Sequence, residues 1–302
     1  MNSRIDSRAD SYGLFQPPYV AFLETVSHLR SRMHRYCARM TGSAMDGEDV
    51  MQEALFEAYQ KLEQFDNSRA LKPWLFRIVH NRCIDFLRRR QVREDAEATS
   101  VESVSIQPIE PSDRASRDAL ERLVTHLPPK ERACVLLKDV FDYSLEEIAE
   151  LVDSTVGGVK AALNRGRGKL ESLQDQPKAE TTANPAVVEV LRLYVERFNR
   201  HDWDGVRELA SADARLRVAD CFAGRLADSP YFIEYERRTV PWLMALGVVD
   251  GEDVVMIMRE DPQGISPFSV IRMGILSGRI VSITDYVKCS WVIDAAVKLT
   301  VR

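Results

Sequence analysis

The chain has 302 residues, of which 45% are hydrophobic and 29% are charged, with 41 Lys and Arg against 46 Asp and Glu. This length indicates about two domains of ordinary size or three small ones, and the composition is typical of a folded protein rather than a disordered one. No apolar run approaches the ~20 residues that cross a bilayer, so we expect no membrane insertion. The net charge of −5, taken alone, argues against a nucleic-acid partner.

The cysteines argue against a disulfide framework and against a zinc site. Their number is odd, they are widely scattered and no C-x-x-C pair occurs. The N-terminal stretch also lacks the apolar core of a secretion signal. These features predict a cytoplasmic protein with no metal site. The five are Cys37, Cys83, Cys134, Cys221 and Cys289.

Two polar stretches divide the chain. The longer one is acidic, rich in Ser and carries two prolines, which is typical of a flexible tether. The segments between them have helical or mixed apolar patterns. The predicted organisation is an N-terminal tail (1–18), a helical domain (19–93), a flexible linker (94–118), a second helical domain (119–173), a short linker (174–185) and a mixed α and β domain (186–302).

The first helical domain contains a helix with an acidic flank. Asp46 is a suitable N-cap for a helix that runs to about Leu62. Val50, Ala54 and Ala58 form its apolar stripe. Charge alone favours an ordinary solvated surface for the neighbouring flank. That flank consists of Asp49, Gln52, Glu53 and Phe56.

A second, basic helix follows, with Pro73 in its first turn, where a missing N–H costs nothing. Leu75, Val79, Cys83 and Phe86 keep to one side, which we expect to be buried. Polar residues share the opposite side at i, i+4, i+8 and i+11. In isolation such a stripe is more often a solvated face, but it also suits contacts with phosphates and base edges. The stripe is Arg77, Asn81, Asp85 and Arg88, and it leads into Arg89 and Arg90.

The second helical domain has a helix-turn-helix pattern. After a helix around 120–126, Pro129 and Ser144 each begin a helix, and Glu147 completes a capping box with Ser144. The helix at 145–151 is short, a tight turn follows, and a longer helix begins at about Thr155. A short helix, a turn and a longer basic helix predict DNA binding in preference to a generic helical hairpin.

The last helix of this domain is the candidate recognition helix. Thr155 caps it, and Lys160, Asn164 and Arg167 share its outer face. The opposite arc, which includes Val159, Ala162 and Leu163, should pack inward. Such side chains can bond base edges and phosphates in the major groove. Residues 160–169 hold four basic residues and no acid, so the local charge differs from the total. Four glycines weaken the helix by ~1 kcal/mol each; they are Gly157, Gly158, Gly166 and Gly168.

The third domain begins with an amphipathic helix at 186–200 and a second helix that ends near Ala210. The patterns that follow predict strands. They lie at 214–219, 253–259, 267–276 and 279–287, with a Ser277-Gly278 turn joining the last two.

The two helical domains together resemble bacterial RNA polymerase sigma factors of the sigma-70 family, extracytoplasmic-function group. The resemblance rests on three motifs in the family order over about 150 residues. They are DGEDVMQEALFEAYQKLEQFD, PWLFRIVHNRCIDFLRRR, and LPPKERACVLLKDVFDYSLEEIAELV with VKAALNRGRGKL. The resemblance implies two all-α domains, a sigma-two helical bundle and a sigma-four helix-turn-helix.

The resemblance also implies roles for single residues. The acidic flank of the first helix, Phe56 included, would bind core RNA polymerase, with Asp49, Gln52 and Glu53 on the β′ clamp helices. The β flap is a further expected polymerase contact. The minus-10 promoter element would be read by Arg77, Asn81, Asp85, Arg88 and Arg89. The minus-35 element would be read by Thr155, Lys160, Asn164, Arg165 and Arg167.

The start of the third domain, AVVEVLRLYVERFNRHDWDGVRELASADARLRV, resembles SnoaL-like domains, which form an α+β cone. The resemblance implies a regulatory or sensing module, which either senses a small ligand or packs against the helical domains. Catalytic relatives use carboxyl groups with a Tyr or His in an apolar pocket. The candidate cavity residues are Asp220, Arg272, Asp285 and Tyr286. We assign no catalytic residue and no cofactor, because analogy of fold is a weak argument for chemistry.

The sequence therefore predicts a promoter-specificity subunit that directs core polymerase to promoter DNA and is not itself an enzyme. Two alternatives remain. One is a ligand-responsive helix-turn-helix regulator that acts without core polymerase, for which an acidic polymerase-docking helix has no use. The other is a SnoaL-like enzyme fused to a DNA-binding region. The sequence does not identify an anti-sigma partner.

Overall fold

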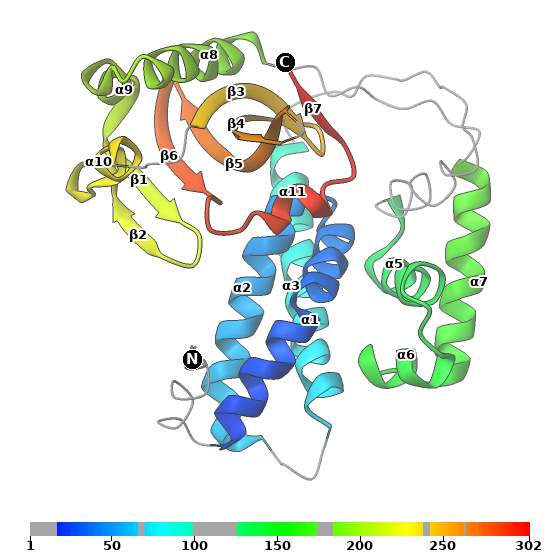
Figure 1. The fold of residues 1–302 in the computed structure, drawn as a ribbon. Helices are drawn as coiled ribbons and strands as arrows, with labels where there is room; N and C mark the ends of the chain where they lie inside the picture. Colours follow the sequence, from blue (N-terminus) through cyan, green and yellow to red (C-terminus); the bar gives the residue numbers. More distant parts are fainter. Residues whose placement is uncertain (1–16, 66–69, 99–125, 174–183, 238–241, 263) are drawn as a thin grey trace. The chain divides into compact units, whose positions relative to one another are not determined.

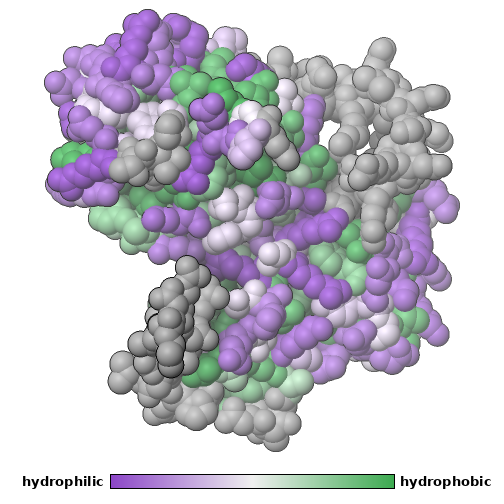
Figure 2. Space-filling view, in the orientation of Figure 1, coloured by the Kyte–Doolittle hydropathy of each residue, from purple (hydrophilic) through white to green (hydrophobic). Residues whose placement is uncertain are grey.

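The computed structural model describes residues 17–65, 70–98, 126–173, 184–237, 242–262 and 264–302. The chain forms two compact units (Figure 1). One is helical and lies within residues 1–175, and the other is an α+β unit formed mainly by Gln176–Arg302. On the face drawn in Figure 2, hydrophilic residues cover much of the surface between smaller hydrophobic patches. Each unit buries its own hydrophobic core. This arrangement confirms the predicted class of all-α domains followed by an α+β domain.

Three long helices open the helical unit: α1 (Pro17–Thr41), α2 (Ala44–Lys61), extended by a 3-10 turn (Leu62–Gln64), and α3 (Leu71–Ala98). The predicted stripe of α2 is buried, and so are Leu75, Val79 and Cys83 on α3. The prediction of Asp46 as N-cap is wrong, because α2 begins two residues earlier. The chain reverses at Gly42, whose φ of +85° suits glycine. Asp46 lies instead in the first turn, where its charge favours the helix dipole.

Helix α3 continues to Ala98, five residues into the predicted linker. Two pairs at i, i+4 spacing stabilise this extension. Arg90 Nε donates to Glu94 Oε1 at 2.7 Å, and Gln91 Nε2 donates to Asp95 Oδ1 at 2.8 Å. The linker boundary at 94 is therefore too early. The remainder of the predicted linker and nearly all of the predicted helix at 120–126 lie outside the described residues.

The helix-turn-helix region contains α5 (Pro129–Val135), a π-helix (Leu136–Val140), α6 (Leu145–Leu151) and α7 (Val156–Leu173). The predicted capping box is present on α6. Glu147 N–H donates to Ser144 Oγ at 3.2 Å, and Ser144 N–H donates to Glu147 Oε2 at 2.8 Å. This cap confirms the predicted start of α6, at Leu145.

One hydrophobic core runs through the helical unit and includes residues from α1, α2, α3, α5, α6 and α7. Arg132 and His80 are among the polar groups buried with it. Arg132 donates to the carbonyl oxygens of Leu127 and Met40, and burial lowers its pKa to about 10. His80 Nδ1 lies 2.8 Å from the Tyr36 hydroxyl. These hydrogen bonds satisfy polar groups that would otherwise destabilise the core.

Close packing of α5 against α7 explains one of the costly glycines. A Cβ atom on Gly166 would lie 2.8 Å from Val135 Cγ2, so the contact requires glycine. Gly168 is different, because a Cβ atom there would have no atom within 4 Å. Glycine at 166 thus serves the approach of two helices, whereas glycine at 168 serves no packing contact.

The α+β unit begins with α8 (Pro185–Asn199) and α9 (Trp203–Leu209), close to the predicted positions. A seven-stranded sheet follows in the order β2-β1-β6-β5-β4-β3-β7, in which β1 and β6 are parallel and the other neighbours antiparallel. Its strands are β1 (Ala210–Val218), β2 (Phe222–Arg225), β3 (Trp242–Val249), β4 (Glu252–Asp261), β5 (Gly264–Leu276), β6 (Arg279–Asp285) and β7 (Leu299–Val301).

Short elements complete the α+β unit and were not predicted. They are a 3-10 turn (Leu226–Asp228), α10 (Tyr231–Glu236) and α11 (Trp291–Ala295). Helix α8 packs against β3 and β4. The core between them contains Tyr194, Phe198 and Tyr235 from the helices, with Val255 and Ile257 from β4. Helix and sheet thus bury a shared aromatic and aliphatic layer.

Two of the four glycines of α7, Gly166 and Gly168, give opposite predictions. Gly166→Ala forces a methyl group against Val135, so we expect a net destabilisation of about 1 kcal/mol. Gly168→Ala adds helix propensity without a clash, so we expect a stabilisation of up to ~1 kcal/mol. Urea unfolding of the two full-length variants measures both. Equal effects of one sign would contradict the packing argument.

The buried histidine predicts a loss of stability in acid. Burial lowers the pKa of His80 to about 4, whereas an unfolded chain has a His pKa near 6.5. The unfolded state therefore binds the proton first as pH falls, and we expect the fold to lose about 3 kcal/mol from this residue between about pH 7 and pH 4. Urea unfolding of the wild type and His80→Gln across this range measures the difference. A His80→Gln profile as steep as the wild-type profile would refute the assignment.

Candidate nucleic-acid and polymerase interfaces

The exposed face of α7 presents the residues predicted to read DNA. Thr155 Oγ1 accepts the N–H of Gly158 at 3.0 Å, which confirms the predicted cap. Val159, Ala162 and Leu163 are buried, so the inward arc is also as predicted. Lys160 and Asn164 are exposed, and neither side chain bonds to another residue in the described part of the chain. Both are therefore free to contact an external partner.

The other basic side chains of α7 are held by acids. Arg165 Nε donates to Glu131 Oε1 at 2.8 Å, and Lys169 Nζ donates to Glu131 Oε2 at 3.0 Å. Arg167 donates two hydrogen bonds to Asp139, from Nε to Oδ2 at 3.1 Å and from Nη2 to Oδ1 at 2.6 Å. Partial burial alone would raise the pKa of Glu131, but these two cations lower it. The carboxylate therefore remains charged and fixes the basic side chains against α5.

A groove of about 270 Å³ lies on this face. Lys160, Asn164 and Arg167 line it together with Lys138 from the π-helix and Leu145 from α6, and Leu163 completes the lining. Sequence reasoning missed Lys138, because no helical period links it to α7. The groove gathers three cationic side chains, which suits a polyanionic partner.

The predicted stripe of α3 also faces solvent. Asn81, Asp85 and Arg88 are exposed, and Arg77 is half-buried. Asp85 and Arg88 form a loose ion pair of 3.7 Å, and Arg89 lies 3.5 Å from Glu53 on α2. Exposed pairs of this kind contribute little to stability. Little free energy is therefore lost when such a pair breaks.

The flank of α2 combines acid and aromatic groups. Phe56 is 62% exposed and Tyr59 is 53% exposed. Glu53 is exposed beside them, while Asp49 and Gln52 are half-buried. Gln52 Nε2 donates to Glu48 Oε1 at 2.9 Å. Tyr59 was missed by sequence reasoning, although its i+3 spacing from Phe56 indicates the same face. Two large exposed aromatic rings on one face make it a candidate protein-binding surface.

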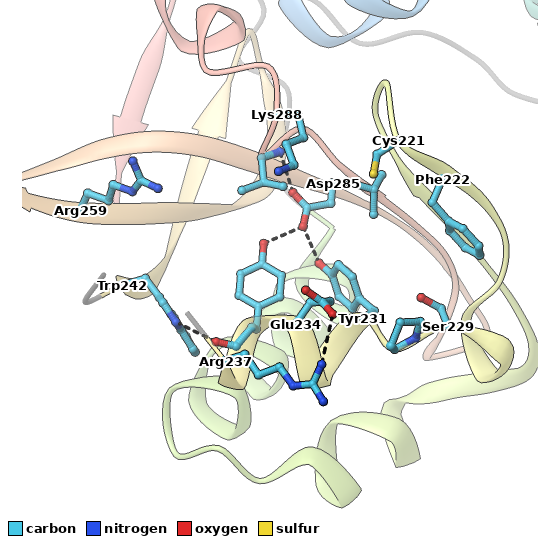
Figure 3. A pocket seen from close by; sticks show the side chains of 14 residues that line it. Cys221, Phe222, Ser229, Tyr231, Glu234, Arg237, Trp242, Arg259, Asp285 and Lys288 are labelled. Atoms are coloured by element: carbon cyan, nitrogen blue, oxygen red, sulfur yellow. Dashed lines mark hydrogen bonds and ion pairs between the residues drawn. The ribbon is translucent and has the colours of Figure 1, made fainter. Parts of the chain in front are cut away.

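A separate cavity of about 700 Å³ opens in the α+β unit (Figure 3). Of the four predicted cavity residues, Asp285 lines it and the other three are not among its lining residues. Arg272 is bound by Glu252 with hydrogen bonds of 2.6 to 3.0 Å. Asp220 is exposed with φ of +60°, and the Tyr286 side chain is fully buried. The placement of these three differs from prediction because the strand pattern alone does not fix which face is hollow.

Asp285 is the polar centre of that cavity and is fully buried. Its Oδ2 accepts hydrogen bonds from the Tyr231 hydroxyl at 2.8 Å and the Tyr235 hydroxyl at 2.6 Å. Its Oδ1 accepts the N–H of Val287 at 2.8 Å. Burial, reinforced by the charge of Asp285, raises the pKa of Tyr231 well above its usual value. Tyr231 is therefore a protonated donor across the neutral range.

No helix in the described ranges is long and apolar enough to cross a membrane. Residues 25–93 match the family model for sigma-70 region 2, and residues 117–170 match the model for sigma-70 region 4. The first match contains α2 and most of α3, and the second contains the helix-turn-helix. The predicted polymerase-binding and DNA-binding residues all lie within these two matches.

Curated relatives extend the match. The chain is 29% identical to the ECF RNA polymerase sigma factor SigG of Mycobacterium tuberculosis over 237 residues, which are 69% of this chain and 61% of SigG. It thus spans about three-fifths of the length of that relative. It is 31% identical to the ECF RNA polymerase sigma factor SigW of Bacillus subtilis over 162 residues, which are 50% of this chain and 87% of SigW.

Two solved structures show weaker likeness. The extracytoplasmic function sigma factor SigJ of Mycobacterium tuberculosis is 18% identical, with a TM-score of 0.35 over 89% of this chain and 97% of SigJ. The sigma factor RpoE of Bartonella quintana, solved with the anti-sigma factor NepR, is 23% identical, with a TM-score of 0.41 over 51% of this chain and 96% of RpoE. On the strength of the two regional matches and of the identity to SigW, the chain belongs to the ECF RNA polymerase sigma factors of the sigma-70 family.

Proposed function

We propose that this protein is a promoter-specificity subunit. It binds core RNA polymerase, directs it to particular promoters and starts transcription, while the polymerase itself carries out the chemistry. The observation that carries the proposal is the presence, in family order, of an exposed aromatic and acidic face on α2 and two polar helix faces on α3 and α7. Because core RNA polymerase is cytoplasmic, the proposed function is a cytoplasmic one.

The face of α2 is the proposed contact with the β′ clamp helices. Exposed Phe56 and Tyr59 supply apolar area, and Glu53 supplies negative charge. Aromatic residues at the centre of a contact, with polar residues around them, are typical of binding hot spots. A helix-turn-helix repressor has no use for such a surface, which favours the sigma-factor function over that alternative. The sigma-four domain would contact the β flap.

The faces of α3 and α7 are the proposed contacts with the minus-10 and minus-35 elements. Asn81 and Asn164 each stand between basic residues of their own helix. Amide side chains can bond base edges, and the neighbouring cations bind phosphates. Binding should weaken steeply as salt rises, because phosphate contacts release counterions.

The C-terminal α+β domain is the proposed regulatory or sensing module, and its SnoaL-like character remains a prediction. The domain has its own core and its own cavity. A small molecule bound in this cavity would change the level of transcription from the promoters that the chain selects. An anti-sigma partner is left open.

Run-off transcription with purified core polymerase on genomic fragments tests the function. We expect specific transcripts with the full chain, and about a tenfold loss of polymerase affinity for Phe56→Ala. Gln60→Ala, an exposed neighbour on the same helix, is the matched control and should behave as the wild type. A chain ending at Leu173 should start transcripts at an altered level. No transcript from either chain would contradict the proposal, and an unaltered level would contradict only the regulatory role.

The ion pair on α7 predicts a change in DNA affinity. Asp139→Asn frees Arg167 for a phosphate, so we expect non-specific DNA binding to tighten about threefold or more and the salt slope to steepen by about one charge. Fluorescence anisotropy at several salt concentrations measures both quantities. Glu171→Gln removes one exposed acid of the same helix and is the control. Equal tightening by both variants would show that net charge, not release of Arg167, is responsible.

A further inference from the structure

The cavity of the α+β domain has the size and walls of a small-molecule site. Its volume of about 700 Å³ falls within the range of roughly 300–1,000 Å³ found for ligand pockets. Apolar and aromatic side chains form much of its wall. These are Val218, Phe222, Pro230, Tyr231, Tyr235, Trp242 and Val287. A ligand that fills this space must therefore present a largely apolar body.

The one fully buried carboxylate of the wall is already occupied by internal donors. The hydroxyls of Tyr231 and Tyr235 donate to Oδ2 of Asp285, and the N–H of Val287 donates to Oδ1. Figure 3 shows Tyr231 pointing toward Asp285. A carboxylate with these three donors has little remaining capacity to bind a ligand cation. Its role is instead to hold the rings of Tyr231 and Tyr235 in place as part of the wall.

The charged side chains of the lining that reach solvent are mainly positive. Arg237 and Lys288 are exposed and Arg259 is half-buried, and all three line the cavity. The opposing exposed acid is Glu234, which lies 3.8 Å from Arg237. The Arg259 guanidinium stacks on the Phe268 ring at 3.5 Å, which fixes its position. These cations therefore attract anions to an otherwise largely apolar cavity.

We propose that this cavity binds an amphipathic organic anion, with an apolar ring or chain against the aromatic wall and a carboxylate beside one of the two exposed cations of the lining, Arg237 or Lys288. The ligand class deepens the sensing role proposed above and rests on it for its biological purpose. Binding itself depends only on the cavity. The alternative ligand is an apolar cation that binds the carboxylate of Asp285, and the test below distinguishes the two.

Isothermal titration of the full chain with three probes of one shape tests the proposal. The probes are 2-naphthoate, the neutral 2-naphthalenemethanol and the cation 2-naphthylmethylammonium. We expect naphthoate to bind about tenfold more tightly than the cation, with the alcohol between them. Equal affinities, a preference for the cation, or no binding of naphthoate would overturn the proposal.

Variants locate the bound probe. Arg237→Glu combined with Lys288→Glu should reverse the order, so that the cation binds more tightly than naphthoate. Lys298→Glu changes an exposed lysine of the same domain outside the cavity lining and should keep the wild-type order. Val218→Trp fills the cavity and should abolish binding of all three probes. Naphthoate binding that survives both cavity variants would place the probe elsewhere and overturn the proposal.

The same protein samples distinguish this proposal from the function on which it rests. If run-off transcripts appear but naphthoate does not bind, the sigma-factor function stands and the ligand class is wrong. If naphthoate binds with the expected order but no promoter fires, the cavity is as proposed and the sigma-factor function is wrong.

Discussion

The ion pairs that Glu131 makes with Arg165 and Lys169 are central to the helical unit, because they join α5 to the helix that should meet DNA. They act together with the close approach of Gly166 to Val135 on the same two helices. These pairs fix Arg165 and Lys169 against α5, at the edge of the hydrophobic core that α5 and α7 share. Under the proposed function, binding to DNA would be an exchange in which phosphates replace or supplement the internal carboxylates.

This exchange resolves the conflict between the net charge of −5 and a nucleic-acid partner. The acids are not spread evenly around the basic residues but stand beside particular ones, as Asp139 stands beside Arg167 and Glu53 beside Arg89. Lys160 and Asn164 remain exposed on the same face of α7. Local placement of charge, rather than its sum, sets the field that a DNA backbone meets. Pairing also reduces the positive charge that these side chains present to any polyanion.

In the α+β domain, too, a charged group is paired with internal partners, but there the group is buried. Two tyrosine hydroxyls and one backbone N–H satisfy the buried carboxylate of Asp285. That network leaves an aromatic hollow with exposed cations in its lining. In the helical unit paired charges lie at the surface and are exchangeable, whereas here the paired charge is buried and shapes a wall.

Local signals in the sequence predicted much of the helical unit. The capping box of Ser144 and Glu147, the cap at Thr155 and the inward arc of α7 depend on residues within a few positions of one another. Helix α10 was missed because it is short, and because Tyr231 and Tyr235 are held by hydrogen bonds to Asp285, 50 or more residues away. The prediction of Arg272 as a cavity residue was wrong for the same reason, because its partner Glu252 lies on another strand.

The pairing of the α7 cations was also beyond sequence reasoning, because it joins residues 28 to 38 positions apart across a helix contact. The parallel pairing of β1 with β6 posed the same difficulty. Periodicity locates a face, but long-range packing decides what that face touches. The family resemblance supplied roles for those faces that no spacing could.

Permanganate footprinting of promoter DNA tests the central claim most directly, because it reports unpaired thymines. With the chain and core polymerase together, the account predicts reactive thymines at the minus-10 element of a promoter that the chain selects, and none with either component alone. Reactivity with core polymerase alone that the chain leaves unchanged, or no reactivity with both present, would contradict it.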